Sequence, residues 1–204
     1  SGSSFDLWVD YIYLDTDERR RFAQVSHEYL IEQLQYQNSS YTASTTQSID
    51  LNFNHPVKEL VWQFSDTASE ASLLNVAQKR GDESTLAAGV DILSGEFKLK
   101  LNGHDRFAER DLKYFTRAQV WQHHTGHGSV NVIDSIAVYS FALKPEEHQP
   151  SGTCNFSRID NSKLVVDATA LGTDTNKSNK LDVYAVNYNV LRIMSGMGGL
   201  AYSN

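Results

Sequence analysis

Three histidines lie close together, at His123, His124 and His127. Imidazoles four residues apart share one face of a helix and could bind a zinc ion there. Gly126 and Gly128 disfavour a helix at this point, and no acidic residue inside the motif could act as a base. We therefore expect a polar loop with solvated histidines and no metal. A metal-dependent enzyme built on His123 and His127 is kept as an alternative.

The single cysteine, Cys154, is the second candidate for chemistry, because a thiolate beside a base is a nucleophile. His148 is near in sequence, but catalytic partners are ordinarily distant in the chain. A small buried cysteine at the start of a strand is the more common situation. The chain also has no G-x-S-x-G elbow, and the glycines of residues 195–199 lack the Lys-Ser/Thr pair of a phosphate-binding loop. The sequence thus predicts no enzyme and no cofactor.

Short surface motifs occur at several places, and each matches easily by chance. Arg80-Gly81-Asp82 is a tripeptide that some cell-surface receptors bind, but a turn made by Gly-Asp is the favoured interpretation. Three N-x-S triplets are formal glycosylation acceptors, which matter only if the chain meets the secretory machinery. Their asparagines are Asn38, Asn155 and Asn176.

Composition limits the classes of protein to which the chain can belong. The formal charge of −7 argues against a nucleic-acid binder, which needs a surplus of Lys and Arg on one face. There is no apolar run of the ~18 residues that span a bilayer, and no signal peptide at the start. We expect residues 1–4 to be a linker or cloning remnant and residues 5–204 to form one domain.

The hydrophobic pattern predicts an all-β protein in which short strands are separated by turn-rich segments. Asp15 and the acidic residues after it predict a short connecting helix over residues 15–24. About eight strands, and no helices of the length that parallel crossovers need, indicate an antiparallel sandwich or barrel. The predicted strands cover residues 5–14, 29–36, 47–53, 57–64, 90–101, 131–143, 155–167 and 182–194.

Aromatic residues make up 11% of the chain. In a two-sheet domain most of them should pack between the sheets. Any that remain exposed would form a partner surface. A carbohydrate-binding β-sandwich is therefore a second alternative, with a tryptophan such as Trp121 as its sugar platform.

Four long segments of the chain closely resemble the major capsid protein of nucleocytoplasmic large DNA viruses, the group of the iridoviruses and the large algal viruses. They cover residues 8–35 (WVDYIYLDTDERRRFAQVSHEYLIEQLQ), 101–115 (LNGHDRFAERDLKYF), 139–160 (YSFALKPEEHQPSGTCNFSRID) and 184–204 (YAVNYNVLRIMSGMGGLAYSN). The resemblance implies two tandem eight-stranded jelly rolls, of which this chain matches the second. It also implies a homotrimeric, pseudo-hexagonal capsomer in an icosahedral virion, with other copies and minor capsid proteins as partners.

Under this resemblance no residue is catalytic, and the candidate residues are structural or lie at interfaces. Pro150 and Gly152 are expected to set the turn between two strands. Arg158 and Asp160 are expected to pair within the domain or across a capsomer interface. Arg192, with the tail at residues 194–204, is a further candidate contact. If Arg158 is buried and paired, its replacement by alanine should cost about 3 kcal/mol or more.

Overall fold

The computed structural model describes residues 6–41, 46–66, 96–126, 136–167 and 179–203. The chain divides into two compact units: residues 1–31 with 190–204, and residues 32–189. We call them unit 1 and unit 2. The predicted linker at residues 1–4 and the Arg80-Gly81-Asp82 motif lie outside the described residues, so both stay predictions.

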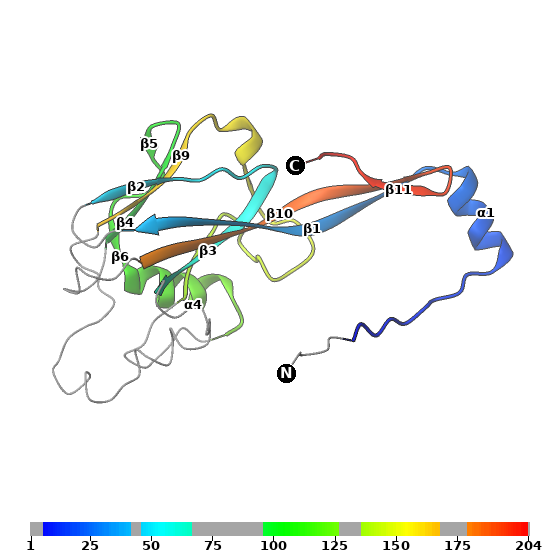
Figure 1. The fold of residues 1–204 in the computed structure, drawn as a ribbon, viewed down its shortest axis with the longest axis horizontal. Coiled ribbons are helices and arrows are strands. Elements are labelled where there is room, and N and C mark those ends of the chain that lie inside the picture. The colour runs from blue at the N-terminus through cyan, green and yellow to red at the C-terminus, as the bar shows by residue number, and fades with distance from the viewer. Residues whose placement is uncertain (1–5, 42–45, 67–95, 127–135, 168–178, 204) are drawn as a thin grey trace. The chain divides into compact units, whose positions relative to one another are not determined.

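The strands form two antiparallel sheets, and the chain crosses from one sheet to the other several times. One sheet has the order β1 (His27–Tyr41), β10 (Asn179–Met194), β3 (Pro56–Asp66), β7 (Ile136–Ser140). The other has the order β2 (Gln47–Asp50), β9 (Ser162–Val166), β4 (Glu96–Leu101), β5 (His104–Asp105). Three short strands extend them, namely β8 (Cys154–Asn155) on β3, β6 (Arg110–Asp111) on β4 and β11 (Met197–Leu200) on β10. Interleaved sheets of this order define a jelly roll, which confirms the predicted fold (Figure 1).

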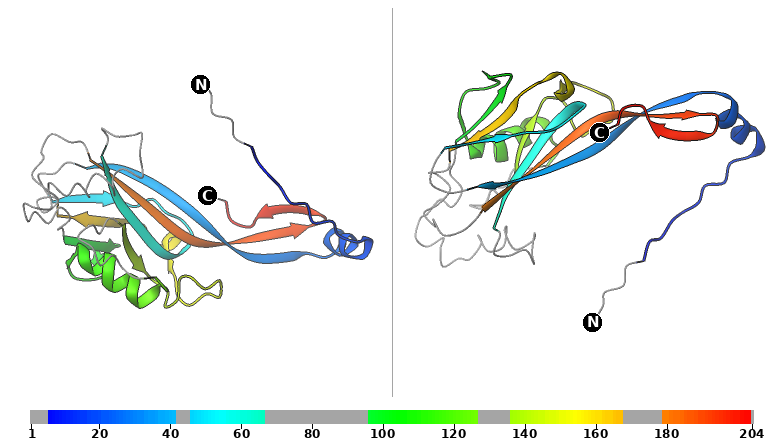
Figure 2. Two further views of the ribbon diagram at one scale, coloured as in Figure 1. Left: turned by 90° about the horizontal axis from the view of Figure 1, so that it is seen from below. Right: turned by 45° about the horizontal axis from the view of Figure 1, so that its top comes forward.

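The core of unit 2 lies between its two sheets. Strand β9 buries every second residue, as a strand with one face on the core should. Trp62 of β3 crosses the layer to Phe97 of β4, with ring centroids 5.7 Å apart, and both side chains are fully buried. Figure 2 shows the two layers from two further directions, with β2, β4 and β9 on one side and β3 and β10 on the other.

A helical segment between β6 and β7 was not predicted from the sequence. It contains the π-helical turn η2 (Tyr114–Ala118) and α4 (Gln119–His123). Asp111 Oδ1 accepts a hydrogen bond from Lys113 N–H at 2.8 Å, which favours a turn at the start. Leu112 and Phe115, three residues apart, are both buried, and Phe115 packs on Trp62. The segment therefore contributes to the core.

The predicted strand at residues 5–14 is wrong for the residues that the structure describes. Residues 6–15 form neither helix nor strand, and Trp8 and Ile12 are 91% and 87% exposed. Apolar residues occur on both faces of this segment, a pattern that is typical of a buried strand. Here the pattern belongs to an exposed segment without regular secondary structure. The predicted helix is confirmed as α1 (Thr16–Gln24), where Asp15 Oδ1 accepts from Glu18 N–H at 2.8 Å.

The single strand predicted over residues 155–167 is also wrong. Asn155 Oδ1 accepts a hydrogen bond from Ser157 N–H at 3.1 Å, a local bond that competes with extended backbone. The chain forms a 3₁₀ turn, η3 (Phe156–Arg158), between β8 and β9. Because β8 pairs with β3 and β9 pairs with β2 and β4, this segment carries the chain from one sheet to the other.

Among the helices that the structure describes, none is long and apolar enough to cross a bilayer.

Candidate functional site

The turn that leads into β8 is held together by backbone geometry. Gly152 has φ +148°, and a Cβ atom placed on it would lie 2.6 Å from the Phe141 carbonyl oxygen. Ser151 Oγ accepts a hydrogen bond from Lys144 N–H at 2.9 Å. Pro150 is exposed. Glycine at position 152 thus allows two backbone segments to approach closely, while an interface role for Pro150 stays a prediction.

Arg158 and Asp160 do not form the buried pair that was considered. Arg158 is exposed, and among the described residues no ion pair joins it to Asp160. The chain here is held instead by Asn102, whose Oδ1 accepts from the N–H groups of Asp160 at 2.9 Å and Asn161 at 3.2 Å. The Asn102 side-chain amide therefore holds the backbone at residues 160–161. A capsomer contact through Arg158 stays a prediction.

Exposure changes the expected cost of losing the Arg158 side chain. Arg158→Ala should alter the free energy of unfolding by less than about 0.5 kcal/mol, because substitutions of exposed, unpaired side chains are usually nearly neutral. Urea denaturation measures this. A loss of about 3 kcal/mol would show that Arg158 has a buried partner in solution.

The three glycosylation triplets lie in different surroundings. Asn38 is exposed on β1, where its amide donates to the Tyr36 hydroxyl at 3.3 Å. Asn155 is half-buried and caps η3, and Ser157 Oγ of the same triplet accepts from His55 N–H at 2.8 Å. Asn176 lies outside the described residues. Asn155 is thus engaged within the fold, and modification at all three positions stays a prediction.

Arg192 has a partner inside unit 1. Its Nε donates to Glu28 Oε1 at 2.8 Å, and a terminal nitrogen lies 2.7 Å from the same oxygen. Both side chains are about half exposed, so solvent screens the pair and limits its contribution to about 1 kcal/mol or less. Arg192 connects β10 to β1, and a contact with another molecule stays a prediction.

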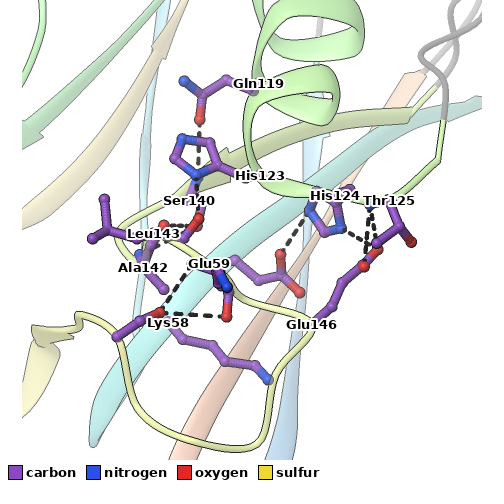
Figure 3. A network of polar contacts seen from close by, with 12 residues as sticks. Lys58, Glu59, Gln119, His123, His124, Thr125, Ser140, Ala142, Leu143 and Glu146 are labelled. Atoms are coloured by element: carbon purple, nitrogen blue, oxygen red, sulfur yellow. Dashed lines mark hydrogen bonds and ion pairs between the residues drawn. The ribbon is translucent and has the colours of Figure 1, made fainter.

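Two of the three histidines, His123 and His124, make specific contacts within the fold. His124 follows α4 directly, and its two ring nitrogens face two carboxylates: Nε2 lies 3.1 Å from Glu59 Oε2, and Nδ1 lies 3.2 Å from Glu146 Oε1. The expectation of a solvated His124 is therefore wrong, because its side chain is only 19% exposed. His123 Nδ1 contacts the Leu143 carbonyl at 3.1 Å. Figure 3 shows side chains from β3, the end of α4 and the turn after β7 converging here.

The electrostatics of the two carboxylates differ. Burial raises the pKa of Glu59 above its ordinary value, although His124 and Lys58 oppose this effect. Hydrogen bonds from Thr125 lower the pKa of Glu146. The backbone N of Thr125 lies 3.1 Å from each carboxylate oxygen of Glu146. Glu146 is thus favoured as an anion, whereas Glu59 sits where a negative charge is costly.

A second buried charge lies next to this cluster. Lys58 Nζ is 2.7 Å from Glu32 Oε1, and the Lys58 side chain is only 4% exposed. Lys58 occupies an irregularity of β3, where the N–H groups of Phe141 and Ala142 both donate to its carbonyl. The sequence contains a signal for this burial. Lys58 is two residues from Leu60 and four from Trp62, which belong to the core, and this spacing in a strand predicts that Lys58 is buried as they are.

Of the two catalytic candidates, Cys154 lies within the described residues, whereas the His123/His127 pair lies partly outside them. Burial raises the pKa of the Cys154 thiol, which favours the unreactive protonated form. Within the described ranges, no three His, Cys, Asp or Glu side chains are grouped to hold a metal ion, and His127 lies outside those ranges. Trp121, the candidate sugar platform, is 75% exposed on α4; carbohydrate binding stays a prediction.

The two sheets and their strand order place the chain in the jelly-roll class of folds. Residues 18–199 match the family described as "Large eukaryotic DNA virus major capsid protein". The chain belongs to this family of capsid proteins, as its four sequence segments suggested.

Relatives of known name and structure agree with this assignment. The major capsid protein of Pyramimonas orientalis virus is 50% identical over the whole chain, and that of Paramecium bursaria Chlorella virus 1 is 45% identical over 98% of it. A solved structure titled "PBCV-1 virus capsid, quasi-atomic model" covers 95% of the chain with a TM-score of 0.72 and 40% identity. The chain spans only 51% and 54% of the two relatives, and 56% of that structure's chain.

Proposed function

We propose that this chain acts as one jelly roll of a major capsid protein that joins other copies in the shell of a virion, and that it works through shape and contact surfaces rather than catalysis. The observation that carries the proposal is family membership combined with a jelly-roll fold. Because the chain matches about half the length of its relatives, we assign it to one of two jelly rolls, the second, in the family's protein.

Unit 1 supports assembly because it exposes apolar side chains without a core of its own. None of its described residues is fully buried. Large exposed apolar patches on a protein surface commonly mark sites of protein association. The exposed apolar side chains of unit 1 include Leu7, Trp8, Tyr11, Ile12 and Tyr13 before α1, and Met194, Met197 and Leu200 near the β10–β11 hairpin.

A homotrimer of capsid chains is the assembly we propose, with closed symmetry that uses the same surfaces on each copy. Minor capsid proteins are proposed as additional partners. The charge of −7 favours protein contacts over direct contact with the packaged nucleic acid, since phosphate binding requires local positive charge.

Light scattering over a concentration series tests this proposal. We expect the mass of the 22.9 kDa chain to rise with concentration toward that of three chains. The triple variant Leu7→Ser, Trp8→Ser, Ile12→Ser should stay near the mass of one chain, because it removes much of the apolar surface before α1.

Leu34→Ser is the matched control, since Leu34 is 63% exposed but belongs to unit 2. It should associate as the unaltered chain does. A plateau at another multiple would contradict the trimer and leave the capsid role standing. A chain that remains a monomer throughout would contradict assembly through unit 1.

A further inference from the structure

His124 lies between two acceptors, and this arrangement requires a proton. A carboxylate oxygen can only accept a hydrogen bond, and a neutral imidazole has one N–H and one lone pair. With Glu59 facing Nε2 at 3.1 Å and Glu146 facing Nδ1 at 3.2 Å, a neutral ring between two ionised carboxylates would place its lone pair against a negative oxygen. Both contacts are attractive only if the three groups together hold one more proton.

The burial of the cluster makes this requirement matter. The side chains of His124 and Glu59 are 19% and 11% exposed, so water screens their interaction poorly. The 3.1 Å contact lacks the alignment of a hydrogen bond and is an ion pair only when the ring is protonated. Among the described residues, neither of the two facing atoms has a hydrogen-bond partner. Glu146, by contrast, is more exposed and accepts from Thr125 N–H. The extra proton therefore belongs to His124 and Glu59.

Other titratable groups described near the cluster are Lys58, Glu32, His148 and Tyr188. Lys58 adds a positive charge on the same strand as Glu59, but it is already paired with Glu32 at 2.7 Å. His148 lies 3.6 Å from that same Glu32 oxygen. Burial raises the pKa of the Tyr188 hydroxyl, and Glu32 and Glu59 add to this, so Tyr188 stays neutral near neutral pH. The described groups around the cluster thus leave Glu59 and Glu146 as the partners of His124.

We propose that His124 is a proton-dependent clamp that fixes the turn at residues 143–147 to α4 and β3. The turn is attached through Glu146, which contacts both His124 and Thr125, and through the Leu143 carbonyl, which contacts His123. Pro145 in the same turn is buried, so an apolar anchor remains when the clamp opens. The docked turn holds a proton that the released turn gives up, and rising pH therefore favours release.

The turn carries an exposed apolar residue, which gives the clamp a consequence for the surface of unit 2. Leu143 is 73% exposed in the turn itself. The same turn leads to the constrained Gly152 and then to β8. Release of the turn would alter a surface of unit 2 without unfolding the sandwich. This inference concerns a local equilibrium of the chain and does not depend on the proposed capsid assembly.

Amide hydrogen exchange of the 204-residue chain, corrected for the intrinsic effect of pH on exchange, tests the clamp. The reporters are Thr125 N–H, which donates to Glu146, and Lys144 N–H, which donates to Ser151 Oγ. From about pH 6 to about pH 9, an interval over which an ordinary histidine loses its charge, we expect their protection to fall roughly fivefold, the size of a partly screened ion pair.

Two variants and one control make the test specific. His124→Gln has no titratable ring and should abolish this pH dependence. Glu59→Gln should keep the reporters protected at about pH 9, because a neutral ring can then donate to Glu146 and accept from the new amide. His104→Gln, at an exposed position of β5, should behave as the unaltered chain does. Protection that does not change with pH, or a pH dependence that survives in His124→Gln, would overturn the clamp; if His124→Gln does not fold, Glu59→Gln decides.

Discussion

Gly152→Ala is expected to lower the free energy of unfolding by about 3 kcal/mol, since overpacking and a strained backbone each cost about 1–3 kcal/mol. The new Cβ would lie 2.6 Å from the Phe141 carbonyl oxygen and 3.3 Å from the Ala142 Cα, and both atoms belong to the backbone. Neither can move aside as a flexible side chain would. Urea denaturation followed by circular dichroism measures the change.

Two glycine controls separate the clash from the cost of backbone conformation. Gly103 has φ +81° but open space around it, so Gly103→Ala should cost only about 1 kcal/mol. Gly126 has neither a positive φ nor a close neighbour, and Gly126→Ala should be close to neutral. If Gly152→Ala costs no more than Gly103→Ala, the close approach to Phe141 does not exist in solution.

Glu32→Ala is expected to cost about 3 kcal/mol, the lower end of the range for breaking a buried ion pair. It removes the carboxylate 2.7 Å from Lys58 Nζ and leaves a buried ammonium that lies over the Tyr188 ring, 5.6 Å from its centroid. The lower end applies because Glu32 itself is 33% exposed. Thermal and urea unfolding near neutral pH measure the loss.

A surface pair provides the matched control for Glu32. Glu147 lies 2.9 Å from Lys144 Nζ, but both side chains are more than half exposed. Glu147→Ala should therefore cost about 0.5 kcal/mol or less. The double variant Glu32→Leu, Lys58→Met should recover most of the loss, since an apolar pair avoids the cost of burying charge. Equal losses for Glu32→Ala and Glu147→Ala would show that Lys58 is hydrated in solution.

Hydrophobic and β-branched composition predicted two central strands of the sandwich. Residues 57–64 and 182–194 lie within β3 and β10, where one face packs on the core. The same pattern failed at residues 5–14. Alternation and aromatic content indicate an apolar surface that is more stable when buried. They do not show whether a sheet of the same chain or another molecule buries it.

Local polar chemistry explains the other errors. Asn155 and Ser157 interrupt a segment of strand-like composition, because a side-chain hydrogen bond competes with extended backbone. The helical segment that contains Phe115 was not predicted, because each of its two helical pieces is only five residues long and shows a weak helical pattern. The signal for a helix in this segment is the three-residue spacing of Leu112 and Phe115, both of which are buried.

The sequence by itself determined the all-β class, the capsid family and the helix that begins after Asp15, since these depend on local composition, long ordered segments and a cap within one turn. Only the tertiary structure showed that His124 lies between Glu59 and Glu146, and that Lys58 is buried beside Glu32. These partners lie 65, 22 and 26 positions apart in the printed sequence. Ionisable side chains have no periodicity that reveals a partner at such a distance, and the pairing follows only once the sheets and the turn bring the groups together.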